Sequence, residues 1–554
     1  MKRTLGVCGL LLGVAVLAGG QMPMGAGAVG PMAGAGASTA ASTALRPLPV
    51  DPVVKKALEG ISAEQVQADL AKLVSFGTRS TLSSMDTELP PGQGILAAAD
   101  WITSEFEAMS KECGGCLEVK RDEFVQPTTT VGYGRIPRPT KLVNVYAILR
   151  GTGGDKAPWV LVTGHYDSRA TDVMDDKLTS PGANDDGSGV AVSLESARAL
   201  SGMAKAGVRL TGTMVFVAVA GEEQGLYGSA HLAKLAKAEG WPLEAVLNDD
   251  IVGGDTTPVA PGAGATMQRK DVVRVFSESV PSNATPEEQR MMLGLGAEND
   301  SPSRELARQI VELSPTFFAT GMGGPSAKMG AMKMGAMQKC GMKTDAMKAK
   351  GMECPMMHGG GMQGEMMQDG MMCPMMPMGR AFHPVMELRR DRYLRGGDHI
   401  SFNAEGFAAV RFSEWRENFD HQHQTLRAEN GVEYGDLPKF VDFRYVVRVA
   451  QLNALTMTSL AAAPSEPQKV RILTSALDNN SELAWEPSAF APPGTTYEVV
   501  WRDTDENRWT HSQSAGAATH LTLNVSKDNV LFGVRAVSAA GDRSLPVPPV
   551  PVRE

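Results

Sequence analysis

Four short apolar runs rich in β-branched residues restrict the fold of this chain more than any other feature. They span residues 142–149, 159–167, 214–223 and 245–253. Such runs are typical of strands that are buried on both faces. A segment with helical spacing, 187–203, lies between the second run and the third. Because strands alternate with helices, we predict an α/β fold in three layers, with a mostly parallel sheet covered by helices on both faces.

Acidic and imidazole side chains gather where these predicted strands end. The set comprises His165, Asp167, Asp185, Glu222, Glu223 and Asp250. The carboxyl ends of parallel strands meet at one edge of an open α/β sheet, where ligands bind. Carboxylates crowded in one crevice would raise each other's pKa unless a multivalent cation held them. Mixed histidine and carboxylate ligands favour Zn²⁺, so we predict a zinc site at this edge.

The adjacent glutamates Glu222 and Glu223 indicate two different roles at the end of one strand. Successive residues that leave a strand point in different directions. One carboxylate can therefore bind a metal while its neighbour faces a water molecule as general base. A lone acidic pair is ordinarily a solvated turn, but this pair occurs in order with the other motifs.

Five motifs occur in the order and spacing of a known family: "GHYDS", "PGANDDGSG", "GEEQGLYGS", "NDDIVGG" and the late "DHISF". They resemble the secreted co-catalytic di-zinc aminopeptidases, relatives of bacterial leucyl aminopeptidase and of glutamate carboxypeptidase. The resemblance covers roughly Ser62 to Ala462, apart from a methionine-rich insertion.

The resemblance implies two zinc ions per chain and a ligand set for each. His165 and Asp250 would bind one ion, and Asp185 would bridge it to the second. Glu223 and a late histidine would complete the ligand set of the second ion. A cis peptide bond between Asp185 and the next residue is implied as well.

The same resemblance implies the remaining roles in the reaction. Glu222 would be the general base, and Asp167 would orient the imidazole of His165. A water molecule that bridges two zinc ions would give its proton to Glu222 and attack a peptide carbonyl as hydroxide. Glu222 would then return the proton to the leaving amine.

The late histidine has two candidates in "ENFDHQHQT", His421 and His423. Family members with three residues between an aromatic position and the ligand favour His423, given Phe419, and His421 stays open. Gln422 stands where the family commonly has tyrosine, so an oxyanion role is not carried over to it. We expect His399 to be structural rather than a ligand.

The predicted function is an exported zinc-dependent exopeptidase, an aminopeptidase that removes N-terminal residues from peptides. The formal net charge of -9, without a sustained basic run, argues against nucleic acid or an anionic membrane as the main partner. Three alternatives stay open: carboxypeptidase activity, glutaminyl-peptide cyclisation in a single-zinc variant, and a non-catalytic metal-binding or adhesive protein on the same scaffold. The intact glutamate pair favours hydrolysis.

The N-terminal residues predict export. Lys2 and Arg3 precede an apolar run to Ala18 and then Gly/Ala-rich residues, which is the layout of a secretory signal peptide. We expect cleavage between Ala18 and Ala37 and a secreted or periplasmic location. The apolar run, about fifteen residues, is short for a membrane span, so we expect no stable span after cleavage.

Composition divides the chain into further segments. The prediction is residues 1–37 for the signal peptide and low-complexity N-terminus, 38–55 for a linker, 56–462 for the zinc peptidase domain, 463–468 for a second linker and 469–554 for a β-sandwich. The last segment holds short alternating runs and resembles a fibronectin type III domain, whose partner the residues do not indicate.

Residues 321–378 form a low-complexity insertion that holds most of the 32 methionines of the chain. Thioether and thiolate ligands favour Cu(I). The candidate copper ligands are Cys354, Met356, Met357, His358 and Cys373. A passenger loop without a ligand is an equal alternative. Because the insertion lies between Asp250 and the late histidine, it would emerge near the rim of the active site.

The sequence "CGGC" places Cys113 and Cys116 at a spacing that suits a tight disulfide. A thioredoxin-like redox pair has the same spacing. Nothing downstream resembles the βαβ context of that motif, so we predict a structural disulfide.

Overall fold

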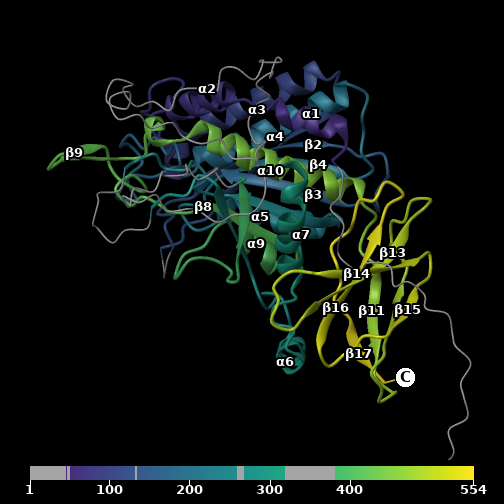
Figure 1. Ribbon diagram of the computed structural model, residues 1–554. Helices are drawn as coiled ribbons and strands as arrows, with labels where there is room; N and C mark the ends of the chain where they lie inside the picture. The colour runs from purple at the N-terminus through teal and green to yellow at the C-terminus, as the bar shows by residue number, and fades with distance from the viewer. Residues whose placement is uncertain (1–44, 46–49, 131–133, 259–266, 319–380, 554) are drawn as a thin grey trace, which may run out of the picture. The chain divides into compact units, whose positions relative to one another are not determined.

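The computed structural model describes residues 45, 50–130, 134–258, 267–318 and 381–553 (Figure 1). Its helices are α1 (Pro52–Glu59), α2 (Ala63–Val74), α3 (Gly94–Glu112), α4 (Gly187–Lys205), α5 (Tyr227–Ala238), α6 (Pro286–Leu295), α7 (Pro302–Phe317), α9 (His399–Ala404) and α10 (Phe443–Ala462), with 3₁₀ turns at Thr81–Met85 and Pro438–Phe440. Ser62 caps α2 as the sequence predicts, because its hydroxyl accepts a hydrogen bond from the backbone N–H of Gln65.

An eight-stranded mixed sheet forms the centre of the larger α/β part. Its strands are β1 (Leu117–Gln126), β2 (Thr140–Leu149), β3 (Trp159–His165), β4 (Thr213–Val219), β5 (Leu243–Asp249), β6 (Val272–Ser277), β7 (His383–Glu387) and β8 (Ala409–Glu414). The order in the sheet is β1-β2-β4-β3-β5-β8-β6-β7. The four adjacent strands β4, β3, β5 and β8 run parallel, which confirms a parallel centre.

The strand β2 differs from the expectation of a parallel strand, since it runs antiparallel to both β1 and β4. Its residues are almost all buried because it lies between these two strands, so its apolar run resembles that of a parallel strand. On the far side, β6 is antiparallel to β8 and parallel to β7. The sheet is therefore mixed at both ends and parallel in the middle.

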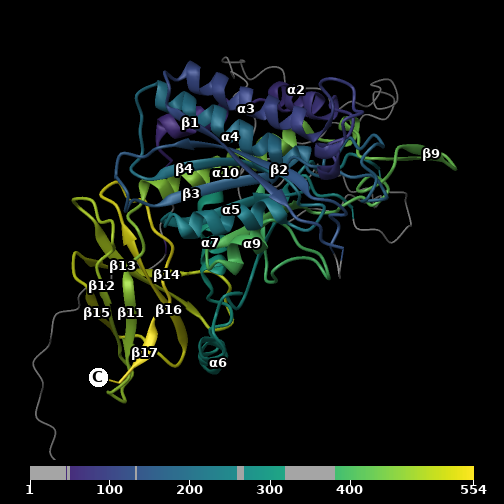
Figure 2. The same cartoon turned by 180° about the vertical axis from the view of Figure 1, so that it is seen from behind.

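Alternating side chains of the central strands build two separate cores, one on each face of the sheet. In β3, Val160 and Val162 pack with α2, α4 and α10, whereas Leu161 packs on the opposite face with residues of α5. Figures 1 and 2 show α1 to α4 on one side of the sheet and α5 and α9 on the other. This arrangement confirms the three-layer α/β/α prediction.

Two small sheets follow α10 and enclose a core of their own. The first contains β11 (Gln468–Leu473), β12 (Ser481–Glu486), β15 (His520–Leu523) and β17 (Val550–Val552), and the second contains β13 (Thr496–Asp503), β14 (His511–Gly516) and β16 (Val530–Val537). Apolar residues of both sheets, including Trp485 and Val534, meet between them. The resemblance to fibronectin type III and the domain boundaries given above stay predictions. A short hairpin, β9 (Arg427–Glu429) and β10 (Val432–Tyr434), stands apart from these sheets.

Charged side chains join α7 to the small sheets. The guanidinium of Arg535, fully buried, pairs with Glu312 of α7 at 2.9 Å and with Glu498 of β13 at 2.6 Å. Arg543 also pairs with both carboxylates. Each buried charge in this group therefore has a partner of opposite sign. We call these four residues the interface ion cluster.

Aromatic contacts hold together the two points between which residues 319–380 are inserted. The ring of Phe318, directly after α7, lies 5.2 Å from the ring of Phe382, directly before β7. Register places His383 at the start of β7 beside Val272, and Glu414 at the end of β8 beside Val273. The described residues that flank this segment therefore lie at the sheet edge to which the carboxyl ends of β5 and β8 point. The candidate copper ligands themselves lie outside the described residues.

Two further observations concern the predicted compartment. Cys113 and Cys116 form a disulfide, as predicted. Among the described residues, none of the helices combines the length and apolar character that a membrane crossing needs. The predicted signal peptide falls outside the described residues.

Candidate metal centre

The carboxyl ends of β3, β4 and β5, together with the loop before α4, bring the predicted ligands together. His165 is the last residue of β3, and Asp250 directly follows β5. Asp185 lies in the loop that leads into α4, and Glu222 and Glu223 follow β4 after a short turn. Because β3, β4 and β5 are parallel, all these loops open at the same edge.

The ligand atoms form two groups, within each of which they lie no more than 4.8 Å apart. The groups are His165, Glu222 and Asp250, and Asp185, Glu223 and His423. Asp185 also connects the groups, since its two carboxylate oxygens face different imidazoles. Its Oδ1 lies 3.2 Å from Nε2 of His165, and its Oδ2 lies 2.9 Å from Nε2 of His423.

Nε2 of His165 and Oε1 of Glu223 are buried, and although each lies 3.2 Å from a polar atom of the cluster, neither contact has the geometry of a hydrogen bond. Buried polar atoms are nearly always satisfied, so each exception requires an explanation. A lone pair on an imidazole nitrogen and one on a carboxylate oxygen are both available to a cation. The donor set thus fits zinc, which binds nitrogen and oxygen ligands of these types.

The charges of the cluster influence each other strongly. The Asp185 carboxyl is buried, yet the imidazoles of His423 and His165 hold its pKa well below the usual range. Burial opposes protonation of His423, but the Glu223 and Asp185 carboxylates outweigh it and raise the pKa of this imidazole to about 10. A cation that binds here must therefore replace a proton on His423.

Glu222 carries a carboxyl group with a raised pKa. Burial raises the pKa of Glu222 well above its usual value, and the carboxylates of Asp250 and Glu223 add to the rise. A raised pKa is the property expected of a carboxyl group that exchanges a proton near neutral pH.

Asp167 connects the end of β3 to the loop after β4. Its Oδ1 lies 3.4 Å from Nδ1 of His165. The same carboxylate accepts hydrogen bonds from the backbone N–H groups of Glu222 and Glu223, at 3.2 and 3.1 Å, and from the Thr81 hydroxyl at 2.9 Å. One buried carboxylate thus positions an imidazole and both glutamates.

The structure brings His423 into the cluster and leaves His421 outside it. Nε2 of His423 lies 3.2 Å from Oε1 of Glu223. Nδ1 of His421 instead pairs with Asp255 at 2.6 Å, and its ring stacks on Phe440 at a centroid distance of 3.7 Å. Of the two candidates left open by the sequence, His423 therefore has the position of a ligand.

His399 and the cis peptide bond agree with the sequence expectations. His399 is buried away from the ligand groups, and its Nε2 lies 2.9 Å from the carbonyl oxygen of Arg390. The Asp185–Asp186 peptide bond is cis. Asp186 itself caps α4 and accepts hydrogen bonds from the backbone N–H groups of Gly189 and His165.

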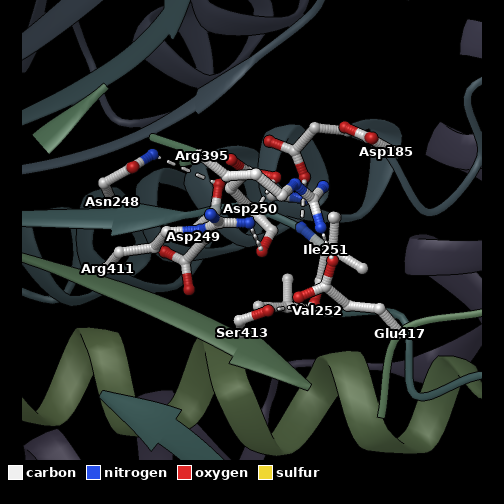
Figure 3. A network of polar contacts seen from close by, with 12 residues as sticks. Asp185, Asn248, Asp249, Asp250, Ile251, Val252, Arg395, Arg411, Ser413 and Glu417 are labelled. Carbon is white, nitrogen blue, oxygen red and sulfur yellow. Dashed lines mark hydrogen bonds and ion pairs between the residues drawn. The ribbon is translucent and has the colours of Figure 1, made fainter. Parts of the chain in front are cut away.

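Three neighbours of the cluster were not found by sequence reasoning. The side-chain amide of Gln422 donates to Oδ2 of Asp185 at 2.8 Å. The Asp436 carboxylate accepts from the backbone N–H of Asp185 at 2.7 Å. Arg411 pairs with Asp250 at 3.1 Å (Figure 3). Asp436 and Arg411 belong to no motif, whereas Gln422 was noted from the sequence as the residue in place of the family's tyrosine, without a role.

A cavity of about 360 Å³ opens over the cluster. Its walls include Asp185, Glu222, Glu223 and Asp250 from the sheet edge and Gln422 and His423 from the late loop. The cluster is therefore accessible to a ligand of small-molecule size.

The chain matches known proteins along most of its length. A family model described as "Peptidase family M28" matches residues 144–294. A probable zinc metalloprotease of Leptosphaeria maculans is 38% identical over 508 residues, which cover 92% of this chain and 99% of that protein. A probable zinc metalloprotease of Pyricularia oryzae is 38% identical over 90% of this chain and 85% of its own.

Solved structures also match, at lower similarity. The crystal structure of the LapA aminopeptidase of Legionella pneumophila has a TM-score of 0.41 at 17% identity and covers 77% of this chain and 78% of its own. A glutaminyl cyclase of Porphyromonas gingivalis has a TM-score of 0.39 at 15% identity, over 72% of this chain and 97% of its own.

Proposed function

This chain belongs to peptidase family M28 and is a zinc metallopeptidase, and from this premise we propose that it is an exopeptidase, specifically an aminopeptidase that holds two zinc ions. The observation that carries the proposal is the pair of three-residue donor groups linked by Asp185. Asp185 would bridge the ions, with His165 and Asp250 on one side and Glu223 and His423 on the other. A single-zinc cyclase would use only one such group.

Bound zinc supplies a water molecule of lowered pKa and a positive charge that polarises a peptide carbonyl. Glu222 accepts a proton at its carboxylate and returns it to the amine of the departing product. Asp167 holds the His165 imidazole and the backbone of both glutamates in place. Gln422 donates to Asp185 and so fixes the orientation of the bridging carboxylate.

The proposed roles of the two glutamates can be separated, because Glu222 also lies within a donor group. Glu222→Gln should retain two zinc ions per chain and lose at least about a hundredfold in kcat, since it removes a proton acceptor. Glu223→Gln should lose zinc. Zinc is counted by atomic emission, and activity is measured on aminoacyl-nitroanilides with and without a chelator.

Peptides blocked at one end test whether the enzyme acts at the N-terminus or at the C-terminus of its substrate. An aminopeptidase cleaves a free N-terminus and rejects an N-acetylated peptide, whereas a carboxypeptidase cleaves the N-acetylated peptide and rejects a C-terminal amide. We expect the enzyme to cleave the peptide with a C-terminal amide and not to cleave the N-acetylated peptide. The opposite pattern would replace aminopeptidase by carboxypeptidase, and cyclisation of an N-terminal glutamine without hydrolysis would replace both.

We also propose that the enzyme is exported. The layout of the first 37 residues supports this location. The Cys113–Cys116 disulfide supports it too, because disulfides persist in oxidising compartments. Fractionation of expressing cells should place the mature chain, shortened at its N-terminus, outside the cytoplasm.

Copper binding by residues 321–378 stays a separate prediction. A variant without this segment should lose Cu(I) binding and keep its zinc. Unchanged copper binding would leave the insertion as a passenger.

A further inference from the structure

The cavity over the metal cluster has positively charged walls. The Asp and Glu side chains that line it are the four site carboxylates, and two divalent ions would offset their charge of four. Among the described residues of the lining, the other side chains with a permanent charge are Arg135, Arg169, Arg392 and Arg395. With the cluster neutralised, the cavity is left with an excess of guanidinium groups.

Three of these arginines are anchored by contacts with their own or neighbouring loops. Arg392 bonds to Asp391, Glu417 and a backbone carbonyl. Arg135 donates to the carbonyl oxygen of Glu223 at 2.8 Å, and Arg169 donates to two backbone carbonyls of its own loop. These contacts fix the loops that form the walls.

Arg395 is held differently from Arg135 and Arg169, by a carboxylate rather than by backbone carbonyls. Within the described residues its guanidinium has one ion-pair partner, Glu417, through Nη1. The side chain is 29% exposed and faces the Asp185 and Asp250 carboxylates, whose charges stabilise its cationic form. Figure 3 shows the Arg395 side chain between Asp185 and Glu417. The guanidinium therefore has an exposed side directed at the metal cluster.

The Glu417 carboxylate that holds Arg395 does not neutralise the charge of its guanidinium. The buried Glu417 carboxylate pairs with three arginines, Arg274 at 3.0 Å, Arg392 at 2.8 Å and Arg395. One negative charge is thus shared by three guanidinium groups. Glu417 holds Arg395 in position and leaves it with positive charge, which suits a planar carboxylate that it can bind through two parallel hydrogen bonds.

We propose that Arg395 binds a carboxylate of the substrate next to the scissile bond, so that the enzyme prefers peptides with an anionic group at that place. The proposal rests on the proposed function and names the substrate class of the same site. The carboxylate is either the free α-carboxylate of a dipeptide or the side chain of an acidic residue. Arg395 is a residue that determines specificity, separate from the zinc ligands and the base.

Two matched pairs of substrates separate the sources of the carboxylate. Leu-Leu against Leu-Leu-amide changes only the α-carboxylate, and Leu-Glu-amide against Leu-Gln-amide changes only the side chain. In the zinc-loaded full chain, we expect one pair to show kcat/KM higher by roughly 10- to 100-fold for the anionic member, mainly through KM. Ratios at or below one in both pairs would overturn the proposal.

The variant Arg395→Gln should bring the larger ratio close to one, and Arg395→Lys should retain part of it, because an ammonium group keeps the charge but not the two parallel bonds. Arg209→Gln is the matched control, since Arg209 is exposed and, among the described residues, donates to a backbone carbonyl, that of Arg150, and does not line the cavity. A ratio that survives in Arg395→Gln with native zinc content would overturn the proposal. If Arg395→Gln does not fold, an unreduced ratio in folded Arg395→Lys has the same meaning.

Binding without turnover distinguishes this proposal from the proposed function. Calorimetry of zinc-loaded Glu222→Gln with the same two substrate pairs should show tighter binding of the anionic member in at least one pair, and the difference should vanish in the double variant Glu222→Gln/Arg395→Gln. If no peptide is hydrolysed but an anionic member still binds more tightly through Arg395, the proposed function fails and the carboxylate site stands. Hydrolysis with equal ratios and equal binding would overturn the carboxylate site and leave the proposed function standing.

Discussion

The metal cluster and the interface ion cluster both bury several charges, but they balance them differently. At the interface, Arg535 and Arg543 are each paired with Glu312 and Glu498, so two cations meet two anions. At the sheet edge, the contacts that buried atoms of His165 and Glu223 make with polar atoms of the cluster lack the geometry of hydrogen bonds. A charge group that is complete stabilises the fold, whereas one that lacks positive charge is a site for a cation.

The largest expected difference is between His423, which belongs to the metal cluster, and His421, which lies outside it. His423→Gln should lose one zinc ion and at least about 10³-fold in kcat/KM, because it removes a ligand. His421→Gln should keep both ions and lose much less activity, because the His421 imidazole contacts Asp255 and Phe440 rather than the ligand groups. Zinc analysis and kinetics on the same preparations measure both. Loss of zinc in His421→Gln but not in His423→Gln would reverse the assignment.

The interface should respond through stability rather than zinc content. Arg535→Met leaves Glu312 and Glu498 with fewer cations in a buried place, so we expect about 3–5 kcal/mol of lost stability toward urea, with unchanged zinc in the folded protein. Arg427→Gln, which breaks the exposed pair with Glu429, is the control and should cost less than about 1 kcal/mol. Equal losses of stability in the two variants would contradict the expected difference between a buried and an exposed ion pair.

Zinc affinity should depend on pH, since the proton on His423 competes with the metal. The pKa of this imidazole is raised to about 10, so zinc displaces a proton at every pH below that value. Apparent affinity should therefore rise with pH, by about tenfold per unit for each proton released. Competition with a chromophoric chelator at pH 6, 7 and 8 tests this. An affinity that is flat over this range would contradict it.

The smallest expected effect comes from two carboxyls near the junction with the small sheets. Burial raises the pKa of Glu466 to about 7 from 4.5, with the Glu305 carboxylate adding to the rise, and Glu466 in turn raises the pKa of Glu244. The folded protein thus holds a proton that the unfolded chain releases, and stability falls as pH rises between 4.5 and 7. Glu466→Gln should raise the Tm at pH 8 by roughly 2–4 °C and change it little at pH 5. A shift of equal size at both pH values would be evidence against this titration.

The parallel centre of the sheet and the residues of the metal cluster could be predicted because their signals are local. Apolar runs mark β3, β4 and β5, and the acidic residues directly follow them. Among the strands that were not predicted, β1 is an edge strand in which charged residues alternate with apolar ones, and β14 is short and polar. Neither strand has an apolar run.

The contacts that refine the cluster come from residues far apart in the chain. Asp436 meets the backbone of Asp185 across 251 positions, and Arg411 meets Asp250 across 161. The choice of His423 over His421 depends on Asp255 and Phe440, which hold the rejected ring. Only the packed structure shows such contacts, because nothing in the local sequence specifies them.

The contact between Phe318 and Phe382 has a consequence for how chains of this design can diverge. The two rings lie 5.2 Å apart, so the described residues on either side of 319–380 already meet. The entropy lost on closing a loop grows only slowly with its length. Evolution, or an engineer, can therefore lengthen, shorten or exchange the material between these two rings while the catalytic scaffold is inherited unchanged.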